Sequence, residues 1–225
     1  MTINNRVTLA IVAVAAILSA CSMPAALQTG ADAEVSYDGL TKVDHTVLDD
    51  VWMRADADLS QYDQVIFQTA EVSYKPVRSV SSIRSDQSEF PMDDKQKERF
   101  LSIATESFTS GLAKSEKFTV ASAAGPNVLL IKSKLQDVVS NVPPRSVGRT
   151  EIFVSEVGSA TLVLELYDSQ SGTILARAID KGKAEGPQNL MRANSITSWR
   201  EVKQMTDSWA AKLRRSLDSL MLPNK

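Results

Sequence analysis

The stretch that decides the fold is Ala160-Thr-Leu-Val-Leu-Glu-Leu-Tyr167. Its alanine and three leucines occupy every second position, so an extended chain places all four on the same side. This alternation predicts a β-strand with one buried face. Asp168-Ser-Gln-Ser-Gly172 follows as a hairpin loop, in which Gly172 can adopt a positive φ. Residues 173–181 are predicted to return as the partner strand.

Three more strands are predicted before this hairpin. Residues 64–74 are rich in β-branched and aromatic side chains, as half-buried strands are. Residues 117–121 form a short second strand. Residues 128–135 begin as a continuous apolar run and then alternate, which indicates a strand that passes from the middle of a sheet to an exposed end.

Two helices are predicted from apolar side chains that recur every three or four residues. The first begins near Asp93 and Asp94, whose charges suit the positive end of the helix dipole, and we expect it to fray at Gly111. The second begins at Ser195 or Thr197. Its apolar stripe comprises Trp199, Val202, Met205, Trp209, Leu213 and Leu220.

This order of elements predicts an α+β fold, a mostly antiparallel sheet of about five strands with two helices packed on one face. We expect a single domain over residues 37–225. Residues 21–36 are small, polar and aperiodic, and are expected to form a flexible tether that carries a lipid.

The N-terminus resembles the signal peptide of a bacterial lipoprotein over residues 1–20. A largely apolar run of twelve residues, 7–18, leads into Ser19, Ala20 and the only cysteine, Cys21. A helix of twelve residues spans about 18 Å, which is too short for a hydrocarbon core of about 30 Å. We expect cleavage between Ala20 and Cys21 and attachment of the lipid to the Cys21 thiol. Ordinary secretory cleavage nearby, with a free or buried Cys21, is the alternative.

The lipoprotein assignment also predicts a location. Ser22 stands where many inner-membrane lipoproteins have Asp. The resemblance to enterobacterial sorting therefore implies an outer-membrane protein that faces the periplasm, with the inner membrane as the weaker alternative.

Composition argues against several kinds of chemistry. Removal of residues 1–20 takes away one of 25 basic residues and none of the 27 acidic ones, which leaves a net charge of −3. This balance does not favour nucleic acid as a partner. A lipidated Cys21 leaves no thiol, and His45 is the only histidine, so we expect no catalytic residues, no metal site and no cofactor. His45 is expected to be an exposed residue of an N-terminal arm.

One cluster of arginines is a candidate anion site. In the predicted sheet the loops at 141–158 and 185–198 lie at the same end, which would bring together Arg145, Arg149 and Arg192. Arginine pairs bidentately with carboxylates and phosphates, so this rim could meet a lipid or peptidoglycan. Solvated surface arginines are the simpler interpretation.

Several stretches together resemble the bacterial lipoproteins of the DUF3313 family. They are Tyr37-Asp-Gly-Leu40, Leu59-Ser-Gln-Tyr-Asp-Gln-Val-Ile66, Leu166-Tyr-Asp-Ser-Gln-Ser-Gly-Thr-Ile-Leu-Ala176, Thr197-Ser-Trp-Arg-Glu-Val202 and Trp209-Ala-Ala-Lys-Leu213. The family's opening segment usually has an aromatic residue where this chain has Leu40. The resemblance implies a lipid-anchored envelope protein without an established activity.

We therefore expect a non-enzymatic envelope lipoprotein that binds or supports another envelope component, a protein or peptidoglycan. A module for an anionic ligand, using the loop arginines, is the first alternative. A hydrolase that uses Asp or Glu is the second, and no spacing of carboxylates argues for it.

Overall fold

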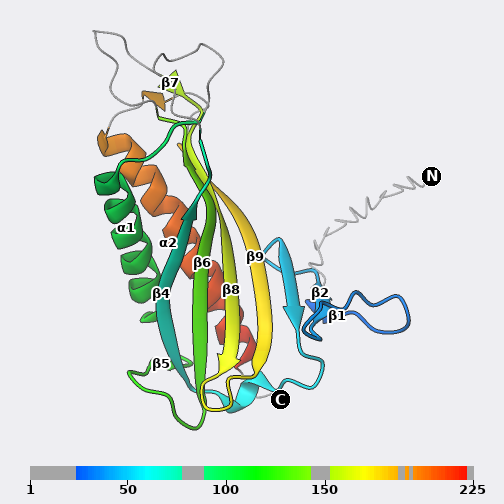
Figure 1. Cartoon of the computed structure of the whole chain (residues 1–225). Helices are drawn as coiled ribbons and strands as arrows, with labels where there is room; N and C mark the ends of the chain where they lie inside the picture. Colours follow the sequence, from blue (N-terminus) through cyan, green and yellow to red (C-terminus); the bar gives the residue numbers. More distant parts are fainter. Residues whose placement is uncertain (1–23, 78–88, 143–152, 187–190, 193–194, 222–225) are drawn as a thin grey trace, which may run out of the picture.

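The computed structural model describes residues 24–77, 89–142, 153–186, 191–192 and 195–221. Eight strands form one sheet in the order β1-β2-β3-β9-β8-β6-β4-β5, with two helices beside it (Figure 1). The strands are β1 (Ala26–Leu27), β2 (Thr41–Asp44), β3 (Asp50–Met53), β4 (Gln64–Tyr74), β5 (Thr119–Val120), β6 (Val128–Ser140), β8 (Glu156–Asp168) and β9 (Ile174–Glu185). The helices are α1 (Asp94–Leu112) and α2 (Ser195–Leu220), and β7 (Phe153–Val154) pairs separately with β10 (Met191–Arg192).

The predicted hairpin is the centre of this sheet. β8 pairs antiparallel with β9 on one side and with β6 on the other. Leu162, Leu164 and Leu166 are buried, whereas the odd-numbered positions between them are half-buried, which confirms the predicted alternation. Gly172 has φ of 69°, as its place in the loop requires. The pairing is mostly antiparallel; β4 runs parallel to both β5 and β6, because α1 carries the chain back across the sheet.

Both helices cover the buried face of the sheet, which confirms the predicted layering (Figure 1). Phe108 of α1 stacks on Phe67 of β4, with 5.0 Å between ring centroids. Trp209 of α2 is only 2% exposed. Asp93 caps α1 in a reciprocal capping box with Gln96, which satisfies two N–H groups of the first turn.

α1 ends at Leu112, one residue after Gly111 and close to where the sequence predicts fraying. Gly111 lies where α1 crosses α2, and a Cβ at this position would come within 2.7 Å of the Ala210 Cβ. The absence of a side chain therefore lets the two helices approach closely. Helical period alone could not distinguish this role from that of a helix terminator.

The sheet has more strands than the five predicted. The five are present as β4, β5, β6, β8 and β9, and the N-terminal arm adds β1, β2 and β3 beyond β9. These additional strands have two to four residues each, too few to produce a recognisable alternation. Part of the segment expected to be a tether is paired, since Ala26 and Leu27 lie opposite Asp44 and Val43. Pairing therefore begins before the expected domain boundary at residue 37.

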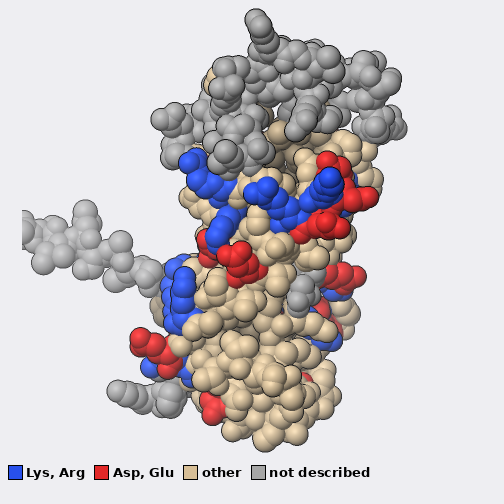
Figure 2. Space-filling view, turned by 90° about the vertical axis from the view of Figure 1, so that its left-hand side faces the viewer, with Lys and Arg blue, Asp and Glu red and all other residues tan. Residues whose placement is uncertain are grey.

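The charged side chains on the side of the molecule that bears α1 are mixed in sign. Lysines and arginines lie among aspartates and glutamates at the height of the helices, and the lower part of this side shows few charges (Figure 2). Within the described ranges, neither helix is apolar enough over its length to span a bilayer.

Candidate functional site

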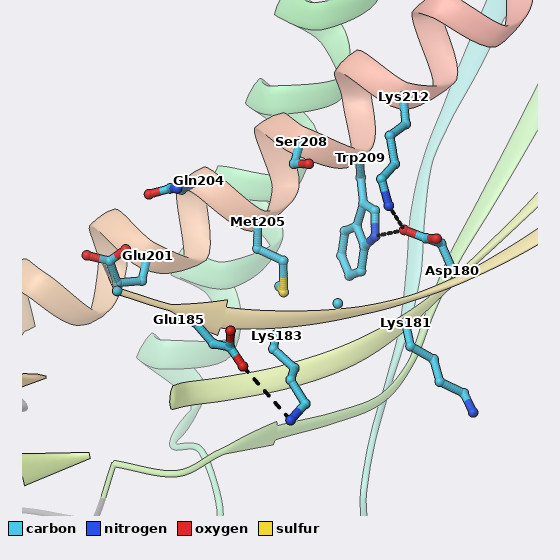
Figure 3. A pocket seen from close by; sticks show the side chains of 12 residues that line it. Asp180, Lys181, Lys183, Glu185, Glu201, Gln204, Met205, Ser208, Trp209 and Lys212 are labelled. Carbon is cyan, nitrogen blue, oxygen red and sulfur yellow. Dashed lines mark hydrogen bonds and ion pairs between the residues drawn. The ribbon is translucent and has the colours of Figure 1, made fainter. Parts of the chain in front are cut away.

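A groove of about 350 Å³ runs between the C-terminal half of β9 and α2 (Figure 3). Its walls are a continuous stretch of strand and one face of a helix. The lining residues are Asp180, Lys181, Gly182, Lys183, Glu185 and Gly186 from β9 and the position after it, and Glu201, Gln204, Met205, Ser208, Trp209 and Lys212 from α2. The helix residues recur every three or four positions, which is why a single face of α2 lines the groove.

The groove exists because β3 covers only half of β9. The pairing of these two strands ends at Asp50 opposite Ile179. One residue earlier in the chain, the Asp49 carboxylate accepts a hydrogen bond of 2.8 Å from the Lys181 backbone N–H, in place of a strand. Beyond Lys181, no strand among the described residues continues along this edge of β9.

The uncovered part of β9 presents backbone groups toward this free edge. The Lys181 N–H points toward β3, and backbone direction alternates along a strand, so the N–H and C=O groups of Lys183 and Glu185 point the same way. The Lys183 Nζ lies 3.0 Å from the carboxylate of Glu156 on the neighbouring strand β8 and 3.9 Å from the carboxylate of Glu185. The hydrogen bond to Glu156 raises the pKa of Lys183.

The floor of the groove is apolar and tightly packed. Met205 and Trp209 point from α2 toward β9, where they meet Gly182 (Figure 3). A Cβ at position 182 would lie 2.9 Å from the indole Cε2 and 3.0 Å from the Met205 Cγ. Glycine is therefore required here for the helix to reach the strand.

Asp180 closes one end of the groove as a buried acceptor of three hydrogen bonds. Its carboxylate accepts from the Lys212 ammonium at 2.7 Å, the Trp209 indole N–H at 2.9 Å and the Asp49 backbone N–H at 3.1 Å. One ammonium and two N–H groups compensate the burial of a residue that is 2% exposed. Asp180 thus joins β9, α2 and the segment before β3.

Glu201 lines the opposite end and is incompletely paired. It is 1% exposed, and its Oε1 accepts two hydrogen bonds from the Arg200 guanidinium, at 2.6 and 2.9 Å. Its Oε2 is buried and has no hydrogen-bond partner among the described residues, and the same is true of the Ser198 hydroxyl one turn earlier. Unpaired buried acceptors cost about 1–3 kcal/mol each, so this end of α2 is a locally unfavourable part of the helix.

The groove can hold a ligand, but its lining residues do not include a nucleophilic side chain paired with a general base. It contains no histidine, and each carboxylate on its walls has a cationic partner: Lys212 for Asp180, Lys183 for Glu185 and Arg200 for Glu201. In the described part of the chain, no three metal-ligating side chains come together.

The residues proposed from the sequence lie elsewhere. Ala20, Cys21, Arg145 and Arg149 fall outside the described residues, and Arg192 belongs to β10 opposite Phe153. The pairing of β7 with β10 joins one two-residue strand from each of the two loop regions. His45 is exposed, as expected.

The sequence contains a signal for the groove on strand β9. On the buried face of β9, the alanines at 176 and 178 are followed by Asp180 and Gly182. A charge and a glycine at core positions indicate a buried polar contact and a close approach. Their partners, Trp209 and Lys212, are 27 or more residues away, so pairing could not be inferred from spacing.

The chain was compared with known proteins. A search of curated proteins found no match. Among solved structures, protein XCC0632 from Xanthomonas campestris is 9% identical, with a TM-score of 0.43 over 72% of this chain and 86% of that chain. Protein CT253 from Chlamydia trachomatis is 10% identical, with a TM-score of 0.40 over 72% and 99%. The PelC dodecamer from Paraburkholderia phytofirmans is 10% identical, with a TM-score of 0.35 over 72% and 96%.

These structural similarities are too distant to transfer a function. The family comparison covers most of the chain, because residues 30–213 match the model described as protein of unknown function DUF3313. This range includes the sheet from β2 to β9 and most of α2, and therefore the whole groove. The chain belongs to the DUF3313 family.

Proposed function

We propose that this chain is a lipid-anchored protein of the outer membrane, with a periplasmic domain that binds another envelope protein without catalysis. The lipid would be attached to Cys21 after cleavage at Ala20, as the residues around the cut favour. The ligand would occupy the groove between β9 and α2. The observation that carries the binding role is the uncovered edge of β9 beside that groove.

The dimensions of the groove fit an extended peptide. Five residues of β9, from Lys181 to Glu185, extend about 17 Å at a rise of about 3.4 Å per residue. The face of α2 from Glu201 to Lys212 is of similar length, about 18 Å for its residues at 1.5 Å per residue. A peptide of about five residues, paired with this edge, would continue the line of β3 and extend the sheet by β-augmentation.

The chemistry of the walls favours particular side chains in such a peptide. Successive side chains of a strand point to opposite faces, so alternate residues would face Met205 and Trp209 or the open side of the sheet. An apolar side chain suits the positions that face Met205 and Trp209. On the open side, Lys181 is exposed, so an acidic residue suits the positions that face it.

The experiment replaces Lys183 by proline. The Lys183 N–H points away from β8, so Lys183→Pro removes a donor from the free edge without removing a hydrogen bond of the β8–β9 pair. Lys183→Ala is the matched control, because it removes the ammonium and keeps the N–H. We expect Lys183→Pro to abolish binding of the partner and Lys183→Ala to retain most of it.

Binding would be measured by photo-crosslinking in cells. A photoreactive residue at Ser208, on the helix wall, should crosslink a defined envelope protein, and one at exposed Gln170 in the hairpin loop should not. The Ser208 crosslink should disappear in Lys183→Pro. Equal crosslinking in the proline and alanine variants would refute edge pairing.

The arginine rim remains a second candidate, favoured by the pairing of β7 with β10, which joins one two-residue strand from each of its two loop regions. It would bind an anionic lipid or peptidoglycan through Arg145, Arg149 and Arg192. Changing all three to glutamine should abolish retention of the protein on peptidoglycan or anionic vesicles. Unchanged retention would eliminate this candidate.

A further inference from the structure

The first strand of the fold begins very close to the proposed lipid. Ala26, the first residue of β1, is five residues after Cys21. An extended chain spans at most about 3.5 Å per residue, so the lipidated cysteine can lie no more than about 17 Å from Ala26. This inference rests on the lipid attachment proposed above, and it concerns which surface of the domain then faces the bilayer.

The arm that carries β1 is firmly attached to the domain. The Arg177 guanidinium on β9 donates two hydrogen bonds to the Asp38 carboxylate, at 2.6 and 3.2 Å, and also binds Glu165 at 2.9 Å. Leu40, two residues later, is fully buried. Between them Gly39 has φ of 79°, and the Ser36 N–H donates to the Leu40 carbonyl, which closes a compact turn.

The charge state of Asp38 supports this attachment. Burial raises its pKa, but the hydrogen bonds from Arg177 and Ser36 outweigh that effect and hold the pKa below the usual 3.8. Asp38 is therefore ionised at neutral pH and paired. Because the arm is attached in this way, the position of the lipid constrains the position of the whole domain.

The register of β1 shows where the lipidated chain leaves the sheet. Ala26 lies opposite Asp44, and β1 runs antiparallel to β2. Residues 24 and 25, which directly precede Ala26, therefore lead toward the turn 45–49 between β2 and β3. Val47 lies in this turn and is 62% exposed.

A second exposed valine lies along the same edge. Val35 is bridged to Thr41 and is also 62% exposed. Leu27 pairs with Val43, two residues along β2, so Val35 is about 7 Å from β1 along the edge. Two exposed valines thus flank β1, at the part of the domain nearest the lipid.

We infer that this edge lies on the bilayer that holds the lipid. The anchor edge consists of Ala26–Leu27, Val35 and the turn with Val47. The sheet would then stand edge-on, with β1 at the membrane and β5, the opposite edge in Figure 1, directed into the periplasm. The two valines would enter the headgroup region, where apolar side chains are favoured over water.

The test uses the single cysteine of the chain. When Cys21 carries a lipid its sulfur is blocked, so a cysteine introduced elsewhere can be labelled selectively. Val35→Cys and Val47→Cys report on the anchor edge. Val120→Cys is the matched control, since Val120 is a valine with 51% exposure in β5 at the opposite edge. Each variant is purified with its lipid, labelled with an environment-sensitive fluorophore and reconstituted into phosphatidylcholine vesicles.

Zwitterionic vesicles are chosen because exposed Asp32 and Glu34 flank Val35 and would be repelled by anionic headgroups. We expect nitroxide-labelled headgroups to quench the fluorophores at positions 35 and 47 at least threefold more than the one at 120. Equal quenching at the three positions would overturn the inference. A protein that does not associate with vesicles and has a free thiol at Cys21 would instead refute the lipid anchor, so the two failures are distinguishable.

Discussion

The indole of Trp209 packs directly on Gly182, so that a Cβ at position 182 would overlap the Cζ2 atom of the ring. This contact sets the separation between α2 and β9 along the groove. It also positions the indole N–H to reach Asp180, two residues earlier on the same face of β9. Core packing and the groove therefore depend on the same pair of residues.

Gly182→Ala should destabilise the fold. The added methyl group must displace Trp209 or the strand, and overpacking of this kind costs about 1–3 kcal/mol. Gly125→Ala is the control, because its Cβ would meet Val128 at an ordinary 3.6 Å. Urea denaturation of both variants gives the comparison. A Gly182→Ala protein as stable as the control would show that the helix is not held so tightly.

Gly111→Ala should also destabilise, against the usual preference of helices. Alanine normally favours a helix over glycine by about 1 kcal/mol. Here the new Cβ would lie 2.7 Å from the Ala210 Cβ, so the clash between α1 and α2 should prevail.

Ala210→Gly should relieve this clash, so the double variant tests its cause. The effects of Gly111→Ala and Ala210→Gly on the free energy of unfolding should fall short of additivity by about 1 kcal/mol. Strict additivity of the two changes would mean that the helices do not meet at these positions.

Asp180→Ala should cost about 3–5 kcal/mol, because it leaves Lys212 and the Trp209 indole N–H without their acceptor. Lys212→Met should cost less. The Lys212 side chain is 27% exposed, and Asp180 would keep two N–H donors. The midpoint of urea unfolding ranks the two variants. The reverse order would contradict the role of Asp180 as the shared acceptor.

The stability of the protein should fall between pH 10 and pH 12. Burial and a hydrogen bond to Asp168 raise the pKa of Tyr62 to about 12, and burial and a hydrogen bond to Glu165 do the same for Tyr167. Both hydroxyls thus keep their protons in the folded chain above pH 10.0, where the unfolded chain loses them. Their contribution is complete below pH 10.0 and is lost as pH rises through the folded pKa.

The alkaline dependence should be reduced in Tyr62→Phe and further reduced when Tyr167→Phe is added. Unfolding free energies at several alkaline pH values provide the measurement, with Tyr37→Phe as the control, since Tyr37 is 92% exposed. An unchanged slope in the double variant would show that other groups control the alkaline transition.

Long alternating and helical stretches were predictable from the sequence. β4, β8 and β9 and the two helices have enough residues for their periods to be recognised, and Asp93 was correctly placed at a helix start. β2 and β3 were not predictable, since four residues of mixed polarity show no period. They are held by tertiary contacts instead, such as the cross-strand pairs of β3 with β9. The close approach of the helices at Gly111 was not predictable, because it depends on the partner residue, Ala210.

The site was less predictable than the fold. The groove is created where the pairing of β3 with β9 stops, at the first residue of β3, and at Lys181 the Asp49 side chain takes the place of a strand. Local sequence carries no signal that a side chain so distant along the chain will bind the Lys181 N–H in place of a strand. The arginine rim rested on loop proximity, of which only the pairing of β7 with β10 belongs to the described residues.

The most direct test of the account is the mass of the N-terminal peptide of the protein isolated from membranes. We predict a mature chain that begins at Cys21 with a diacylglyceryl group on its sulfur, and a Cys21→Ala chain that keeps residues 1–20 and lacks the lipid. A mature chain that begins elsewhere, or that carries a free thiol at Cys21, would contradict the account.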